Sequence, residues 1–173
     1  MRPDLEAKFE DFVAGASPRL FRAAYAITRD HHLAEDAVQS ALGKAYARWS
    51  RVSRSEQPEA YVRRMVVNEV LSWRRRKALT EVPTDVPPVD DPRRAPAPPD
   101  TLLADSDAMW QALGRLAPRQ RAVVVLRYYE HLSEVEIAET LGVRPGTVKS
   151  QCAAALARLR LLLADTRTER ERV

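Results

Sequence analysis

The chain has 173 residues, a net charge of +4 and a single cysteine, which is enough for one ordinary domain or two small ones. No apolar run approaches the roughly 18 residues of a membrane span, and one cysteine excludes an internal disulfide and suits a reducing compartment. The segment MRPDLEAKFEDF contains acids and lacks the apolar core of a secretory signal. We therefore expect a cytoplasmic protein that does not contact membranes.

Helical periodicity runs through the first part of the chain, where glycine is almost absent and no segment alternates as a strand would. The pattern predicts helices at about 5–14, 18–28, 31–50 and 58–79. The third has an apolar stripe of Val38, Ala41, Leu42, Ala45 and Trp49, and a polar face of Glu35, Asp36, Gln39, Ser40 and Lys44. The fourth points Val62, Met65, Val66 and Trp73 inward and carries Arg64, Asn68, Leu71 and Arg75 on a separate stripe.

Residues 80–104 differ from the rest in composition. They hold seven of the twelve prolines and five acidic residues against two basic ones, so they can neither sustain a helix nor build a core. We predict a Pro-rich acidic linker between domains at 1–79 and 105–173. As a coil it would average about 25–30 Å and when extended it would reach roughly 75 Å, enough for two domains to contact DNA about two helical turns apart. Whether its acidity has a function or it only separates the domains stays open.

After the linker, Asp105 or Ser106 can cap a helix that contains Ala108, Met109, Ala112, Leu113 and Leu116. Pro118 begins the next predicted helix, which places Ala122, Val123, Val125, Leu126 and Tyr129 inside. These residues suffice for a small helical core. The last nine residues, from Asp165, are expected to be a frayed charged tail.

Residues 132–163 predict a helix-turn-helix. Ser133 and Glu136 form a capping box, Gly142 suits a left-handed helix end, and Pro145 suits a first helical position. The first helix buries Val135, Ile137, Ala138 and Leu141, and the second buries Val148, Cys152, Ala155, Leu159 and Leu162. The other face of the second helix opens with the hydrogen-bonding side chains of Thr147, Lys149, Ser150 and Gln151. This layout is typical of proteins that read the DNA major groove.

Three segments, taken in order, resemble the extracytoplasmic-function (group 4) sigma factors of bacterial RNA polymerase, and within them the actinobacterial SigE-like group. Residues 30–39 read DHHLAEDAVQ, close to the family's D-x-x-x-A-E-D-x-x-Q pattern; residues 58–76 read PEAYVRRMVVNEVLSWRRR; residues 116–129 read LAPRQRAVVVLRYY and precede the helix-turn-helix. The resemblance implies an all-α fold, with a sigma region 2-like bundle and a sigma region 4-like helix-turn-helix joined by the linker.

The resemblance also implies a role for each surface. The polymerase clamp would contact Leu33, Asp36 and Gln39. The minus-ten promoter element would contact a base-holding loop and a basic helix, formed by Arg51, Ser53, Arg54, Ser55, Gln57, Tyr61, Arg63, Arg64, Asn68, Arg74, Arg75, Arg76 and Lys77. The minus-thirty-five element would contact Arg119, Arg121, Arg144, Thr147, Lys149, Ser150, Gln151 and Arg158. The implied partners are core RNA polymerase, promoter DNA and an anti-sigma factor.

The chain departs from the family's pattern in its second DNA-binding helix. Arg144 stands at the N-cap, where it is a poor cap, and Ala153 and Ala154 stand where polar side chains often project. Fewer side chains are then available to read bases. We therefore expect a weak minus-thirty-five interaction that depends on DNA shape and backbone.

Structural explanations compete with some of these roles. The 74–77 basic run could be a solvated helix end, Asp36 and Gln39 could be ordinary surface residues, and Tyr128, Tyr129 and Trp49 are expected to pack. Cys152 is expected to be buried, and His31 and His32 lack a second ligand pair, so no metal site is expected.

No phosphate loop or catalytic signature occurs in the sequence, so neither a cofactor nor an enzyme activity is expected. Two other functions compete with promoter recognition within the polymerase. One is a polymerase-independent helix-turn-helix regulator, although the sequence shows neither a heptad run nor a ligand motif. The other is a protein-interaction module whose basic faces bind an acidic protein.

Overall fold

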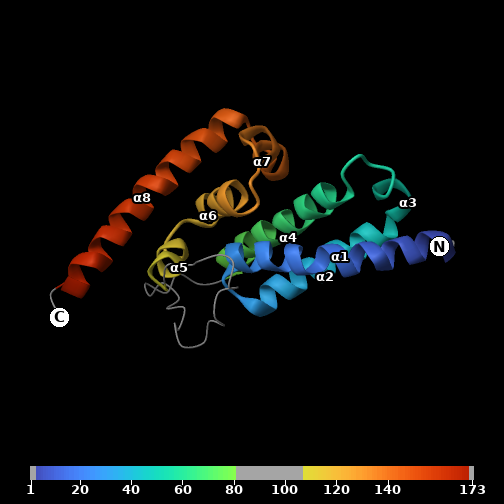
Figure 1. Ribbon diagram of the computed structural model, residues 1–173, viewed down its shortest axis with the longest axis horizontal. Helices are drawn as coiled ribbons and strands as arrows, with labels where there is room; N and C mark the ends of the chain where they lie inside the picture. The colour runs from blue at the N-terminus through green and yellow to red at the C-terminus, as the bar shows by residue number, and fades with distance from the viewer. Residues whose placement is uncertain (1–2, 81–106, 172–173) are drawn as a thin grey trace. The chain divides into compact units, whose positions relative to one another are not determined.

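The computed structural model describes residues 3–80 and 107–171, which fall into two compact units. The first contains α1 (Pro3–Thr28), α2 (His31–Ala47), α3 (Trp49–Val52) and α4 (Pro58–Thr80). The second contains α5 (Asp107–Gly114), α6 (Pro118–Val124), the π-helix η1 (Val125–Tyr129), α7 (Glu134–Leu141) and α8 (Pro145–Glu171) (Figure 1). No strand occurs in these residues, so the predicted all-α fold is confirmed. None of these helices is long and apolar enough to cross a membrane.

In the first unit α2 packs against both α1 and α4 (Figure 1). Its inward face is built mainly of small side chains, and Ala34, Ala37, Ala41 and Ala45 are each fully buried. Small residues at a helix contact let the helix axes approach closely. Larger side chains fill the remaining space, including Leu20 and Ile27 from α1 and Val62, Val66, Val67 and Val70 from α4.

The prediction of two helices at 5–14 and 18–28 was wrong. α1 is a single helix of 26 residues that runs without a break through Gly15 and Pro18. A proline inside a helix removes one hydrogen bond and costs about 3 kcal/mol. Burial of Ala16 and Leu20, on either side of Pro18, holds the helix against the rest of the unit and offsets that cost. Tertiary packing therefore overrides the local breaker.

Polar side chains define the turn between α1 and α2. Arg29 has a left-handed φ of 58°, and its N–H donates to the Tyr25 carbonyl at 2.7 Å. The Thr28 hydroxyl donates to the Asp30 carbonyl at 2.9 Å, and Asp30 then caps α2 by accepting from the Leu33 N–H at 3.0 Å. The start of α2 is thereby fixed relative to α1.

The predicted helix 31–50 ends three residues early, because Arg48 leaves the helical conformation (φ −123°, ψ 18°) and separates α2 from α3. The break lets Trp49 turn into the core, where it is 3% exposed and packs against Phe9 and Phe12 with ring centroids 5.1 and 5.0 Å apart. The prediction that Trp49 packs is confirmed.

The second unit is built around α6 and η1. Residues 121–126 are all buried, which an ordinary amphipathic surface helix does not show. The chain widens into η1 at Val125, and a left-handed His131 (φ 56°) then redirects it into α7. The helix predicted from Pro118 is confirmed in its start, whereas the π-helix was not predicted.

The predicted cap and turn of the helix-turn-helix are confirmed. Ser133 and Glu136 form a reciprocal capping box, with Ser133 N–H donating to the Glu136 carboxylate at 2.8 Å and Glu136 N–H donating to the Ser133 hydroxyl at 3.2 Å. Gly142 is left-handed (φ 66°) and α8 begins at Pro145. Val148, Ala155, Leu159 and Leu162 are buried as predicted.

Some burial predictions for the second unit were wrong. Val135 is 55% exposed, and Thr140 takes its place on the inner face of α7, where its hydroxyl donates to the Glu136 carbonyl at 2.7 Å. Cys152 is only half-buried, and Tyr128 is 54% exposed. Partial desolvation, followed by the neighbouring Cys152, raises the pKa of the Tyr128 phenol above its ordinary value.

The ends of α5 and α8 also differ from the predicted ones. α5 ends at Gly114, so Leu116 lies beyond it although it is buried as predicted. α8 continues to Glu171, which contradicts a frayed tail from Asp165. The predicted linker lies outside the described residues except for Thr80, which ends α4, and so do both predicted caps of α5.

Two glycines with equally open surroundings should respond oppositely to alanine. Gly142→Ala forces a side chain into the left-handed conformation and should lower the free energy of unfolding by about 1–2 kcal/mol. Gly43→Ala, inside α2, should raise it by about 0.5–1 kcal/mol. Urea unfolding followed by circular dichroism measures both effects, and changes of the same sign in the two variants would contradict the assigned backbone conformations.

Candidate nucleic-acid interface

The segment around α3 is a rigid platform for an exposed basic loop. Trp49 and Val52 are buried on its inner side. The loop that follows closes on α3, with the Ser53 N–H donating to the Trp49 carbonyl at 2.8 Å and the Ser55 hydroxyl donating to the Val52 carbonyl at 2.7 Å. These hydrogen bonds anchor the loop to α3.

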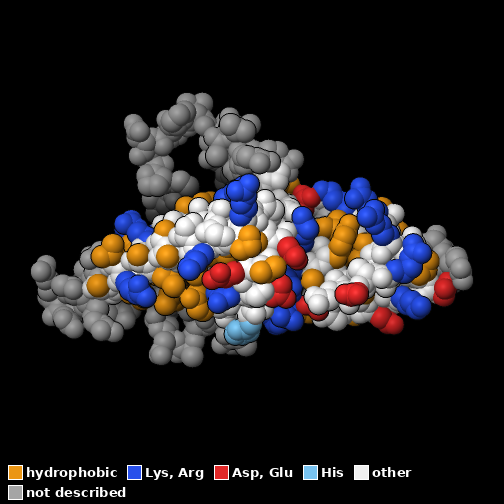
Figure 2. Space-filling view, turned by 90° about the horizontal axis from the view of Figure 1, so that it is seen from above, with side chains coloured by type: hydrophobic (Ala, Val, Ile, Leu, Met, Phe, Trp, Pro, Cys, Tyr) orange, Lys and Arg blue, Asp and Glu red, His pale blue; other side chains and the backbone are white. Residues whose placement is uncertain are grey.

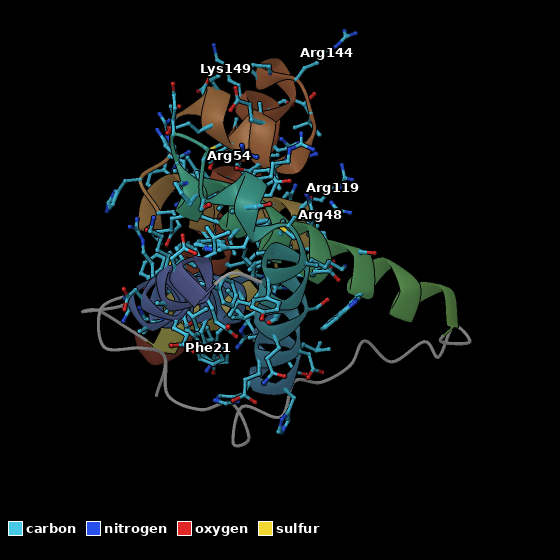
Figure 3. All side chains as sticks on the ribbon, turned by 90° about the vertical axis from the view of Figure 1, so that its right-hand side faces the viewer. Phe21, Arg48, Arg54, Arg119, Arg144 and Lys149 are labelled. Atoms are coloured by element: carbon cyan, nitrogen blue, oxygen red, sulfur yellow. The ribbon has the colours of Figure 1, made fainter. Side chains whose placement is uncertain are left out.

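Of the predicted loop residues, Arg51, Arg54 and Gln57 are exposed, and Ser53 and Ser55 are half-buried. The Arg54 Nε donates to the Ser50 carbonyl at 2.7 Å, which leaves the far end of its guanidinium group as the part facing solvent. Arg48, which sequence reasoning missed, is also exposed and belongs to the same segment (Figure 3). The feature that could have pointed to Arg48 is the break between α2 and α3, which this residue creates. Figure 2 shows Lys and Arg side chains gathered over the end of the first unit that carries α3.

α4 presents a second polar stripe. Tyr61, Arg64 and Asn68 are exposed and lie three and four residues apart, so they share one face of the helix. Arg63 differs, because it is only 8% exposed and lies on the buried side with Val62. Arg74, Arg75, Arg76 and Lys77 belong to the last turns of α4, and their side chains lie outside the described residues.

The predicted polymerase-binding residues lie along one side of α2. Asp36 and Gln39 are exposed and Leu33 is half-buried, each three residues from the next. The opposite side of the helix is the alanine stripe that packs on α1 and α4. Lys44, near the other end of α2, forms an ion pair with Glu69 of α4. Because the inner side of α2 is packed on α1 and α4, the position of its exposed face is fixed.

In the second unit, Arg144, Thr147, Lys149 and Ser150 are exposed around the start of α8, and Gln151 is half-buried. Figure 3 shows the side chains of Arg144 and Lys149 extending away from the ribbon. A small hollow lies between α6 and the start of α8. Arg119 of α6 lines it together with Thr147 and Gln151 of α8, so these predicted DNA-binding residues share one surface. Arg158, also exposed, lies two turns beyond Gln151 on the same side of α8.

From Gly146 to Ala157, the outermost face of α8 carries little side-chain chemistry. Gly146, Ala153, Ala154 and Ala157 are exposed there, and space beside Gly146 is open. The Ser150 hydroxyl donates to the Thr147 carbonyl at 3.0 Å, so its hydrogen is engaged within the helix. Small side chains let a backbone approach closely but provide few donors to base edges.

Arg121 was predicted to contact DNA but lies in the core. It is 3% exposed, and its guanidinium group donates to the Gly114 carbonyl at 3.0 Å and to the Leu116 carbonyl at 3.2 Å. The Gly114 carbonyl lies at the end of α5 and the Leu116 carbonyl lies in the turn before α6, so Arg121 joins α5 and this turn to α6. Arg121 and Arg63 are therefore structural side chains in this fold.

Two all-helical units, one with a basic platform and the other with a helix-turn-helix, define a promoter-binding class of protein. Residues 12–80 match the family Sigma-70 region 2, and residues 106–159 match Sigma-70, region 4. The chain belongs to the sigma-70 family of transcription initiation factors, and it is an alternative sigma factor of the extracytoplasmic-function type.

Relatives from actinobacteria are similar over most of their length. The RNA polymerase sigma-E factor of Streptomyces coelicolor is 39% identical over 156 residues, which cover 88% of this chain and 84% of that protein. The ECF RNA polymerase sigma factor SigM of Mycobacterium tuberculosis is 37% identical over 152 residues, which cover 87% of this chain and 74% of that protein.

A solved structure has the same fold. It is the sigma factor RpoE of Bartonella quintana, crystallised in complex with the anti-sigma factor NepR. The match has a TM-score of 0.68 and 23% sequence identity, and it covers 91% of this chain and 97% of that one.

Arg121→Met keeps much of the side-chain volume but removes the donors to the Gly114 carbonyl at the end of α5 and to the Leu116 carbonyl in the turn that follows. Leaving buried carbonyls unsatisfied should lower the free energy of unfolding by about 1–3 kcal/mol. Arg119→Met, at an exposed position of the same helix, is the matched control and should change stability by less than about 0.5 kcal/mol. Thermal unfolding measures both, and equal stability of the two variants would exclude the structural role of Arg121.

Proposed function

We propose that residues 1–79 form the polymerase-binding and minus-ten-recognition domain, that 80–104 is a linker, and that 105–173 is the minus-thirty-five-recognition domain. This proposal rests mainly on the first unit, where different faces of one helical core expose different kinds of side chain. In the first unit one core exposes an acidic and polar face on α2, a basic loop after α3 and a polar stripe on α4. Such a core can bind a protein partner and DNA simultaneously without rearrangement.

The α2 face is the proposed contact with core RNA polymerase. Leu33, Asp36 and Gln39 combine an apolar side chain, a charge and an amide on one side of a rigid helix. A half-buried leucine supplies contact area, while a carboxylate at the edge of the interface gives orientation and specificity. The partner surface would be the clamp coiled coil of the largest polymerase subunit.

The loop after α3 is the proposed holder of a base flipped from the non-template strand. Unstacking a base costs a few kcal/mol, which a preformed pocket offsets through edge contacts and stacking. Arg51, Ser53, Arg54, Ser55 and Gln57 supply hydrogen-bonding groups on a loop that is already anchored. Arg48 is added to this set because it is exposed on the same platform.

α4 is the proposed contact with the neighbouring DNA backbone. Tyr61, Arg64 and Asn68 form its exposed stripe, and the basic residues at 74–77 continue the sequence of the same helix. Arginine and asparagine side chains donate to phosphate oxygens and fix a protein's register on a duplex. We leave Arg63 out of this contact because its side chain is buried.

The helix-turn-helix is the proposed contact with the minus-thirty-five element. Arg119, Arg144, Thr147 and Lys149 surround the start of α8, and Ser150, Gln151 and Arg158 extend the surface. Because the outermost face of α8 carries alanines and a glycine, we infer binding that depends mainly on phosphate contacts and groove shape. Arg121 is left out of this set because it lies in the core.

We also propose that the protein acts in the cytoplasm as a polymerase subunit, without catalytic activity of its own, and that an anti-sigma factor controls it. The Bartonella quintana RpoE, which has the same fold, was crystallised with such a protein. An inhibitor that covers the α2 face would block polymerase docking directly.

Asp36→Lys reverses the charge at the middle of the proposed polymerase face. It should weaken binding to core polymerase at least tenfold, about 1.4 kcal/mol, because an opposite charge now meets the surface that accepted the carboxylate. Glu10→Lys, an exposed reversal on α1, is the matched control. Fluorescence anisotropy with labelled protein measures both, and equal affinities for the two variants would remove α2 from the docking surface.

Lys149→Ala removes a charge at the edge of the DNA-binding face of α8. If Lys149 contacts a base, promoter affinity of the polymerase complex should fall by about 1–3 kcal/mol. If it contacts a phosphate, affinity should fall for all sequences and the salt dependence should become shallower by about one unit. Lys8→Ala, an exposed site on α1, is the control, and unchanged binding in Lys149→Ala would exclude it from the interface.

A further inference from the structure

Three metal-ligating side chains gather at the start of α2. The available ligand atoms of His31, His32 and Glu35 all lie within 4.8 Å of one another. The Glu35 Oε2 is 3.4 Å from the Nδ1 of His31 and 3.9 Å from the Nδ1 of His32. Two imidazoles therefore face a single carboxylate oxygen. The sequence pattern pointed away from a metal because it offered no second ligand pair, but one carboxylate from the next turn supplies the third ligand.

The spacing fits a transition-metal ion. Metal–nitrogen and metal–oxygen bonds of about 2.0–2.2 Å place the ligands of a tetrahedral ion about 3.3–3.5 Å apart. The His31–Glu35 separation of 3.4 Å lies in this range, and the longer separations would have to shorten by rotation of the exposed side chains about their own bonds. Water would fill the fourth position. Imidazole together with carboxylate favours zinc, nickel and copper over magnesium, which prefers oxygen ligands alone.

Contacts with α1 order one of the ligands before an ion arrives. The His31 ring packs edge-to-face on Phe21, with centroids 5.0 Å apart and planes at 63°, and lies 6.4 Å from the Tyr25 ring (Phe21 is labelled in Figure 3). The positive end of a helix dipole disfavours a cation. Here the Asp30 carboxylate caps the same helix end, which places a negative charge beside the site.

We propose that His31, His32 and Glu35 form a surface binding site for a divalent transition-metal ion of the zinc, nickel or copper class. His32 is four residues before Asp36, so a bound ion lies one helical turn from the docking face on α2. The significance of that position rests on the proposed function, whereas the metal site itself does not depend on it.

The test uses the untagged full-length protein without polymerase, so that it is independent of the proposed docking. Isothermal titration with zinc chloride should show saturable binding of one ion, while magnesium chloride should give no binding heat. His31→Ala, His32→Ala and Glu35→Gln should each weaken zinc binding at least about tenfold. Because all three positions are exposed, circular dichroism should show an unchanged fold.

Two substitutions in the second unit serve as matched controls. His131→Ala removes another exposed imidazole, and Cys152→Ser removes the thiol, and neither should change zinc affinity. Absence of saturable binding below about 1 mM zinc would overturn the proposal. Binding that survives Glu35→Gln, or that disappears with His131 or Cys152, would also overturn it.

Discussion

The close packing of α2 between α1 and α4 is the constraint on which the first unit depends. Four fully buried alanines on the inner face of α2 allow that packing, and burial of this face determines which side of the helix meets solvent. The proposed docking residues occupy that outer side. The same unit packs Trp49, at the start of α3, against Phe9 and Phe12 of α1, and Trp49 anchors the basic loop. A larger side chain at Ala37 or Ala41 would push helices apart and displace both proposed surfaces together.

In the second unit, α6 and η1 form the central element, or hub, on which α7 and α8 pack. Residues 121–126 of α6 and η1 are all buried, and Arg121 uses its guanidinium group to hold the end of α5 and the turn after it against them. α8 packs one apolar stripe, from Val148 to Leu162, on this hub, which leaves its polar start exposed. One side of α8 packs in the core and the other is the proposed DNA-binding surface, so few of its positions are available for base contacts. This explains how an α8 with an alanine-rich outer face is compatible with a stable unit.

The parts of the fold that could be predicted from the sequence are those that short-range interactions determine. The capping box at Ser133, the left-handed Gly142 and the first-turn Pro145 each specify backbone geometry through a few neighbouring atoms, and all three were predicted correctly. Failures came where distant packing decides. Pro18 lies inside a continuous helix, Thr140 replaces Val135 on a buried face, and Arg63 and Arg121 lie in the core although arginines usually mark a surface. The site residues of the remaining surfaces stay predictions, because only binding partners can test them.

Reconstituted transcription tests the central claim most directly. Purified protein and core RNA polymerase would be combined on genomic DNA fragments, and the 5′ ends of the transcripts would be mapped. The account predicts start sites that appear only when both components are present and that share two upstream sequence elements at a fixed spacing. Sequence-specific DNA binding by the chain alone, with no new start sites and no association with core polymerase, would contradict it.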